Sequence, residues 1–178
     1  MGVLSDRHAL VCGSSRGIGR ACAAALAADG AVVTICGRTE ARLSDAARRI
    51  AAVAGHGGSV QTVVSDVTNE ESVRVAVDQA SQPTGVLNGC IANAGGGGAM
   101  APFALQDAEE FIRVLHLNVL GTMLCVKHTV PHMVAAGGGS FVGMSSIAAH
   151  LPHPYFGAYC VAKAGIEEMM RNCANEFG

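Results

Sequence analysis

Two kinds of apolar segment alternate along this chain of 178 residues. Short segments rich in β-branched residues are apolar at nearly every position, which predicts strands buried on both faces. Longer Ala-rich segments, two of them ending at Gly, have the spacing of helices. The expected strands cover residues 8–13, 31–37, 59–66, part of 85–95 and 139–146. The expected helices cover residues 17–30, 40–55, 69–80, about 107–136 and about 155–177, and the third of them opens with Asn69 as its N-cap.

This alternation of strand and helix indicates the α/β class, with a parallel sheet covered on both faces. Right-handed crossovers favour a doubly wound sheet with its strands in the order 3-2-1-4-5. The expected loops are residues 55–58, 82–85, 95–102 and 150–154, and no internal repeat is present. The length indicates a single domain over residues 1–178.

The fifth expected strand raises a question about the sheet edge. The sequence stops directly after the last helix, which would leave an apolar strand at an uncovered edge, an aggregation hazard. Either another segment pairs with that edge, or this chain is not a whole natural protein. We favour the second reading and expect the chain to be incomplete at its C-terminus.

Composition narrows the class of protein. Half of the residues are hydrophobic, 15% are charged and the net charge is −2, so no basic footprint for nucleic acid is present. Gly, Pro, Asn and Gln interrupt the long uncharged stretches before they reach membrane-spanning length, so we expect no membrane association. Seven scattered Cys without a Cys-x-x-Cys pair favour reduced thiols in a cytoplasmic protein.

His128 and His132 have the i, i+4 spacing of a metal-binding pair. No acidic third ligand lies near them in the sequence, and a helix C-terminus favours His for electrostatic reasons. We therefore expect no metal site.

The segment GSSRGIG, at residues 13–19, joins the first strand to the first helix. Glycines at 13, 17 and 19 would let the backbone turn sharply and approach a pyrophosphate at the helix N-terminus. The alternative is a plain tight turn, but the position at the first strand–helix junction favours dinucleotide binding. The candidate binding residues in this segment are Gly13, Ser15, Arg16, Gly17, Ile18 and Gly19.

The end of the second strand bears on the type of dinucleotide. A site for NAD(H) usually has an acidic residue there, whereas this chain has Arg38 after Gly37. An arginine attracts the 2′-phosphate of NADP(H), and Arg16 in the glycine loop is a second candidate for that contact. The alternative is that both arginines are solvated surface residues. We favour NADP(H) over NAD(H).

Tyr159 and Lys163 lie four residues apart on the last expected helix, so their side chains share one face. A nearby cation favours a phenolate, which suits a tyrosine hydroxyl to exchange protons with a substrate. Taken alone, the pair could be an ordinary surface pair. Tyr155 is beyond the i+4 reach of Lys163, and we expect it to line a cleft or to pack.

With these features in place, the sequence resembles the short-chain dehydrogenase/reductase family over residues 8–178. The matching features, in order, are the glycine loop 13–19, Asp66-Val67, the Asn93-Ala94-Gly95 segment, Asn118, Ser145-Ser146 and the pair Tyr159/Lys163. Cys12 and Ala92 stand where the family often has Thr and Asn. The family continues with two further strands, a Pro-Gly segment over the nicotinamide and a substrate-binding loop, all of which lie beyond this sequence.

The resemblance implies a Rossmann-like fold that lacks the family's last two strands, and it implies residue roles. Asp66 would bond the adenine amino group beside Val67, and Asn93, Ala94 and Gly95 would line the cofactor's ribose region. Tyr159 would be the acid/base and Lys163 its partner, which also reaches the ribose. Ser146 would orient the substrate carbonyl. Asn118 would hold a water that relays protons to Lys163, although a mid-helix Asn could simply be a satisfied buried polar group.

The resulting hypothesis is an oxidoreductase that interconverts a carbonyl and a secondary alcohol with NADP(H). The family's substrates include 3-oxoacyl thioesters, ketones, sugars and steroids, and the sequence does not choose among them. The alternative is a non-catalytic dinucleotide-binding module, or an inactive fragment of such an enzyme. The resemblance also implies a homodimer or homotetramer built on the helices at 107–136 and 155–177.

Overall fold

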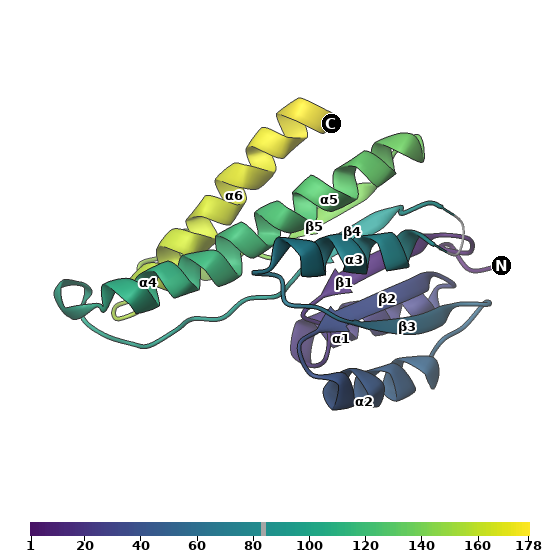
Figure 1. Cartoon of the computed structure of the whole chain (residues 1–178), viewed down its shortest axis with the longest axis horizontal. Coiled ribbons are helices and arrows are strands. Elements are labelled where there is room, and N and C mark those ends of the chain that lie inside the picture. Colours follow the sequence, from purple (N-terminus) through teal and green to yellow (C-terminus); the bar gives the residue numbers. More distant parts are fainter. Residues whose placement is uncertain (83–84) are drawn as a thin grey trace.

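The computed structural model describes residues 1–82 and 85–178. Five parallel strands form one sheet in the order β3-β2-β1-β4-β5, which confirms the predicted doubly wound arrangement (Figure 1). The strands are shorter than the sequence suggested. Their bounds are β1 (His8–Cys12), β2 (Val32–Gly37), β3 (Ser59–Val64), β4 (Gly89–Ala92) and β5 (Ser140–Gly143).

The helices follow the strands in the predicted order. Three of the four predicted loops are irregular, whereas the predicted loop at 82–85 includes Pro83 and Thr84, which lie outside the described residues. The helix bounds are α1 (Gly17–Ala28), α2 (Glu40–Ala51), α3 (Glu70–Ser81), α4 (Ala108–Leu115), α5 (Gly121–Ala135) and α6 (Gly157–Phe177). Two short 3₁₀ turns, η1 (Phe103–Leu105) and η3 (Ile147–Ala149), precede α4 and α6.

The predicted helix at 107–136 is one continuous rod with a change of pitch in its middle. The five residues between α4 and α5, η2 (His116–Leu120), form a π-helical turn. Asp107 caps the rod by accepting a hydrogen bond from the Glu110 amide at 2.8 Å. The predicted cap of α3 is also present, because the Asn69 side chain accepts from the Ser72 amide at 2.9 Å.

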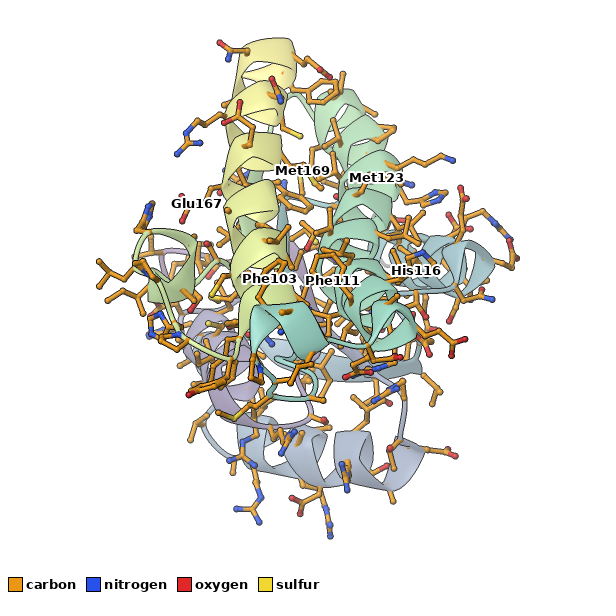
Figure 2. The ribbon with its side chains drawn as sticks, turned by 90° about the vertical axis from the view of Figure 1, so that its left-hand side faces the viewer. Phe103, Phe111, His116, Met123, Glu167 and Met169 are labelled. Carbon is orange, nitrogen blue, oxygen red and sulfur yellow. The ribbon has the colours of Figure 1, made fainter. Side chains whose placement is uncertain are left out.

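Two apolar clusters cover the two faces of the sheet. Leu10 and Leu87 belong to the cluster under α3 and α5, and Val11, Ile35 and Ile50 belong to the cluster under α1 and α2. Adjacent residues of β1 point into opposite clusters, as the two-residue period of a strand requires. Helix α6 lies beside α5, as Figures 1 and 2 both show.

Strand register brings the functional loops to one edge of the sheet. Cys12 of β1 stands opposite Cys36 of β2 and Ala92 of β4, so these three strands end together. The loops that follow them therefore meet at the carboxyl edge, where α/β sheets bind ligands. Within the described part of the chain, β5 pairs with β4 alone, and Val142 is 44% exposed.

Candidate active site

The glycine loop turns between β1 and α1 in the way its sequence predicts. Gly13 has φ 69°, and a Cβ atom there would lie 2.7 Å from the Ala94 Cα atom, so no other residue fits. At Gly19 a Cβ atom would lie 2.6 Å from the side-chain nitrogen (Nδ2) of Asn93 and 2.7 Å from the Gly13 carbonyl oxygen. The loop is therefore held closely against the segment that follows β4.

Two side chains fix the loop in this position. The Ser14 hydroxyl donates to the Val11 carbonyl at 2.7 Å and accepts from the Cys36 amide at 3.1 Å. The Asn93 side chain donates to the carbonyl oxygen of Gly13 at 3.0 Å. Ser14 was not among the predicted site residues, and its only sequence signal is a small hydroxyl residue inside the glycine loop.

A cleft of about 450 Å³ opens at the carboxyl edge of the sheet, above the N-terminus of α1. Helix α1 begins without a side-chain cap, so its first amide groups remain free to bind an anion. Free amide groups at a helix N-terminus beside a glycine loop are suited to binding the phosphates of a dinucleotide. Its lining includes most of the predicted cofactor residues: Gly13, Ser15, Arg16, Gly17, Ile18, Arg38, Asp66, Val67, Asn93, Ala94 and Gly95.

Three arginines line this cleft. Arg16 and Arg38 were predicted from the sequence, whereas Arg42, in the first turn of α2, was not. Its only sequence signal is the four-residue spacing from Arg38. All three side chains are exposed and line the same cleft, so they could form charged hydrogen bonds to a phosphate bound there.

Asp66 lies in the cleft with one carboxylate oxygen already engaged. The Thr68 amide donates to Oδ1 at 3.0 Å, and the Thr68 hydroxyl donates to the same oxygen at 2.8 Å. These bonds, together with the positive charge of Arg38, lower the pKa of the Asp66 carboxyl. The carboxylate stays ionised, and its second oxygen is free to accept from an amino group.

Tyr159 and Lys163 meet on one face of α6, as their spacing predicts. The Lys163 Nζ atom lies 5.5 Å from the centre of the Tyr159 ring, within cation–π distance. Lys163 is 3% exposed, and its ammonium group donates to the Met144 carbonyl at 2.7 Å. Burial lowers the pKa of Lys163 to about 8. Lys163 is thus a desolvated cation placed against the tyrosine.

Asn118 lies in the π-helical turn and is fully buried. Its side chain donates to the carbonyl oxygens of Gly96 and Val114, at 2.9 Å each, and accepts from the Gly96 amide at 3.3 Å. A Cβ atom at Gly95 would lie 2.5 Å from the Asn118 oxygen and 3.3 Å from Lys163 Nζ. Asn118 is therefore a satisfied buried polar group that also lies close to Lys163.

Ser146 belongs to the connection between β5 and α6. It caps η3, where its hydroxyl oxygen accepts from the Ala148 amide at 3.2 Å. This connection also contacts the loop after β4, because the Ala101 amide donates to the Tyr155 carbonyl at 3.2 Å. Tyr155 itself is 53% exposed and has φ 72°, a backbone conformation that is rare outside glycine.

Comparison with known proteins explains this arrangement. The family model described as short chain dehydrogenase matches residues 7–178, which is nearly the whole chain. The chain belongs to the short-chain dehydrogenase family. Members of this family are oxidoreductases that use a nicotinamide dinucleotide and act on CH–OH groups.

Two curated relatives show the degree of similarity. The chain is 38% identical over 170 residues to the cis-4-hydroxycyclohexanecarboxylate dehydrogenase of Sinomonas cyclohexanicum, covering 96% of this chain and 67% of the relative. It is 34% identical over 176 residues to the 7alpha-hydroxysteroid dehydrogenase of Clostridium sardiniense, covering 98% of this chain and 66% of the relative. The chain thus spans about two thirds of the length of these relatives.

Solved structures agree with the family assignment. A short-chain type dehydrogenase/reductase from Mycobacterium ulcerans matches with a TM-score of 0.95 and 42% identity, over 97% of this chain and 63% of that protein. The NAD⁺-bound xylitol dehydrogenase matches with a TM-score of 0.93 and 28% identity, over 98% of this chain and 66% of that protein.

The histidine pair of this short-chain dehydrogenase has an acidic neighbour that is distant in the sequence. The sequence shows no acid near His128, but α3 brings Glu70 to it, with 3.2 Å between Nε2 and Oε1. Glu70 also accepts a hydrogen bond from Lys127. Among residues 1–82 and 85–178, His, Cys, Asp and Glu side chains nowhere gather in threes in a way that could hold a metal.

None of the helices that the structure describes combines the length and the apolar character that a membrane span requires.

Proposed function

We propose that this chain carries the NADP(H)-binding and catalytic residues of an oxidoreductase that interconverts a carbonyl and a secondary alcohol. The observation that carries the proposal is the buried ammonium of Lys163, which lies against the Tyr159 ring and next to Gly95, a residue that lines the cleft beside the glycine loop. A bound nicotinamide would supply or accept the hydride. The protein must then move one proton and hold the reacting oxygen in place.

The proton step falls to Tyr159. Its hydroxyl would donate a proton to the carbonyl oxygen during reduction and take it back during oxidation. Lys163 stabilises the phenolate that this step leaves behind, because a charge–charge attraction is strong in a site screened from water. Ser146 would donate a hydrogen bond to the same substrate oxygen, where negative charge develops. Asn118 would hold a water through which Lys163 exchanges protons with solvent.

The preference for NADP(H) is part of the proposal. Arg16, Arg38 and Arg42 share the cleft lining, and Gly37-Arg38 stands where an acidic residue would repel a 2′-phosphate. The family as a whole uses either dinucleotide, and the xylitol dehydrogenase among the solved relatives carries NAD⁺.

The cofactor preference can be measured by titrating the protein with NADPH and NADH. We expect NADPH to bind more tightly, and Arg38→Ala to weaken NADPH binding about tenfold or more while leaving NADH unchanged, since each charged contact contributes roughly 1.5–3 kcal/mol. Arg113→Ala is the control, because Arg113 pairs with Glu110 on α4 and does not line the cleft. Equal losses for the two dinucleotides would contradict the preference.

The alternative is a non-catalytic dinucleotide-binding module, or an inactive fragment of an enzyme. A panel of ketones, a 3-oxoacyl thioester, a sugar and a steroid, each assayed with NADPH, separates the two hypotheses. Turnover on any member supports the enzyme. Tight NADPH binding without turnover on any member would support the module or the fragment.

Further parts of the proposal concern the whole protein. We propose that residues 1–178 form a single dinucleotide-binding and catalytic domain that is incomplete at its C-terminus; the chain spans about two thirds of the length of the relatives. The proposed setting is the cytoplasm. The proposed assembly is a homodimer or homotetramer built on the α4–α5 rod and α6.

A further inference from the structure

Glu167 lies on α6 one turn beyond Lys163, on the flank of the helix that faces away from α5 (Figure 2). Its side chain is only 20% exposed, which is low for a carboxylate. One oxygen, Oε1, accepts a hydrogen bond from the Ser145 hydroxyl at 2.9 Å and lies 2.9 Å from His150 Nε2. A single carboxylate oxygen thus contacts two residues of the β5–α6 connection.

These two contacts bracket Ser146. Ser145 directly precedes it in the chain, and His150 follows it by four residues, just after η3. The Ser145 hydroxyl also lies 3.2 Å from the Lys163 carbonyl, but its one proton favours the charged acceptor, which forms the stronger bond. The connection is therefore fastened to α6 on both sides of the residue that would orient the substrate.

Helix α6 carries the other half of the reacting set. Tyr159 lies two turns before Glu167, and Lys163 lies one turn before it. The helix therefore keeps the spacing between these two residues and the Glu167 carboxylate constant. The connection packs against α6 through η3, and Met144 accepts a hydrogen bond from Lys163. Without the Glu167 contacts, the packing of η3 and the Met144 hydrogen bond would be the remaining ties between this connection and α6, so the position of Ser146 relative to Tyr159 would be less fixed.

We propose that Glu167 is a positioning residue that fixes Ser146 relative to Tyr159 by holding Ser145 and His150 against α6. This inference rests on the proposed function for its catalytic consequence. Its structural part, the fastening of residues 144–156 to α6, can be measured without any substrate.

The chain offers a matched control in the next residue. Glu168 is 63% exposed and pairs only with Arg171, at 2.7 Å, among the residues that the structure describes. Glu168→Ala removes a carboxylate from the same turn of the same helix but leaves Ser145 and His150 untouched. Glu167→Gln removes the charge of Glu167 and keeps an oxygen that accepts from both residues.

The experiment compares the full chain with its Glu167→Ala, Glu167→Gln and Glu168→Ala variants. Three quantities are measured for each protein: the amide hydrogen exchange of residues 144–156, the NADPH dissociation constant, and kcat and KM with a ketone that the original chain reduces. We expect Glu167→Ala to speed the exchange and to lower kcat by up to about 10²-fold, because a displaced reacting group costs that much. Its NADPH dissociation constant should stay within about twofold of the original.

Glu167→Gln should restore most of kcat and of the exchange protection, and Glu168→Ala should match the original chain. The proposal is overturned if Glu167→Ala leaves the exchange unchanged, if Glu168→Ala loses as much, or if the loss appears only in KM. Ser145→Ala, which removes one of the two donors, should give a smaller effect of the same kind and replaces Glu167→Ala if that variant does not fold.

The two proposals fail in distinguishable ways. A chain that turns over no substrate in any form contradicts the proposed function, and the exchange comparison then decides alone whether Glu167 fastens the connection. Turnover with unchanged exchange in Glu167→Ala contradicts only the role of Glu167.

Discussion

At the scale of single residues, Lys163 is a buried ammonium group whose charge has a use in the proposed reaction. Its 3% exposure removes most of the water that would solvate the charge, and the Met144 carbonyl replaces only part of that solvation. Burial lowers the pKa of Lys163 to about 8 for this reason. Such a cost at a functional site is expected where the same charge stabilises a phenolate.

The Lys163 pKa predicts a pH dependence of stability. The unfolded chain binds this proton below its usual pKa of 10.5, and the folded chain binds it only below about 8. Between these values the unfolded state holds more protons, so the free energy of unfolding rises as pH increases from 8 to 10.5. At 1.36 kcal/mol per pKa unit the upper limit of this rise is roughly 3–4 kcal/mol.

Urea unfolding at several pH values measures this rise, with Lys163→Met as the reference that lacks the titrating group. We expect the original chain to gain stability relative to Lys163→Met between pH 8 and 10.5, and no relative change from pH 6 to 8. Parallel stability curves across the whole range would mean that Lys163 is solvated in the folded protein.

At the scale of elements, the glycine loop shows which positions depend on glycine and why. Gly17 has φ 58° but open space where a Cβ atom would lie, so alanine there costs only backbone strain. At Gly19 a Cβ atom would press on Asn93 and on the Gly13 carbonyl, which would push the loop after β1 away from the segment after β4.

We therefore expect Gly19→Ala to weaken dinucleotide binding more than Gly17→Ala does. Overpacking costs about 1–3 kcal/mol, which corresponds to a loss of about fivefold to 150-fold in affinity if the whole cost falls on the bound form. Titration with NADPH measures both variants. A larger loss for Gly17→Ala than for Gly19→Ala would contradict the close contact between the loop and Asn93.

The elements also show how far sequence reasoning extends. Local patterns predicted the strands and the shared face of Tyr159 and Lys163, because each depends on residues near one another in the chain, and the right-handed crossover rule predicted the strand order. The π-helical turn at Asn118 was not predicted, because its hydrogen bonds to Gly96 form only after folding. The same holds for Glu70 beside His128 and for Glu167 with Ser145, which are 58 and 22 residues apart.

At the scale of the whole molecule, the chain presents apolar side chains on the outer surface of its longest helices. Figure 2 labels Met123 and Met169 on α5 and α6, and Met123 is 37% exposed. Ile112 on α4 and Val161 on α6 are 50% and 46% exposed. These residues belong to the α4–α5 rod and α6, on which the proposed homodimer or homotetramer is built.

The proposed assembly is tested by sedimentation velocity of Val161→Asp, because a buried unpaired charge at an interface is strongly unfavourable. We expect the original chain to sediment as a dimer or tetramer and the variant to shift toward monomer. Val75→Asp is the control, since Val75 on α3 is 44% exposed and lies outside these helices. An unchanged assembly in Val161→Asp would place the interface elsewhere.

The central claim is that the cleft holds NADPH, which supplies a hydride to a carbonyl group, while Tyr159 beside Lys163 supplies the proton. The most direct test compares the original chain with Tyr159→Phe. NADPH consumption is followed with a ketone that the original chain reduces, and NADPH binding is measured on both proteins. Removal of the hydroxyl should lower kcat by about 10²-fold or more and leave the NADPH dissociation constant within about twofold. Turnover by Tyr159→Phe at the original rate would contradict the account.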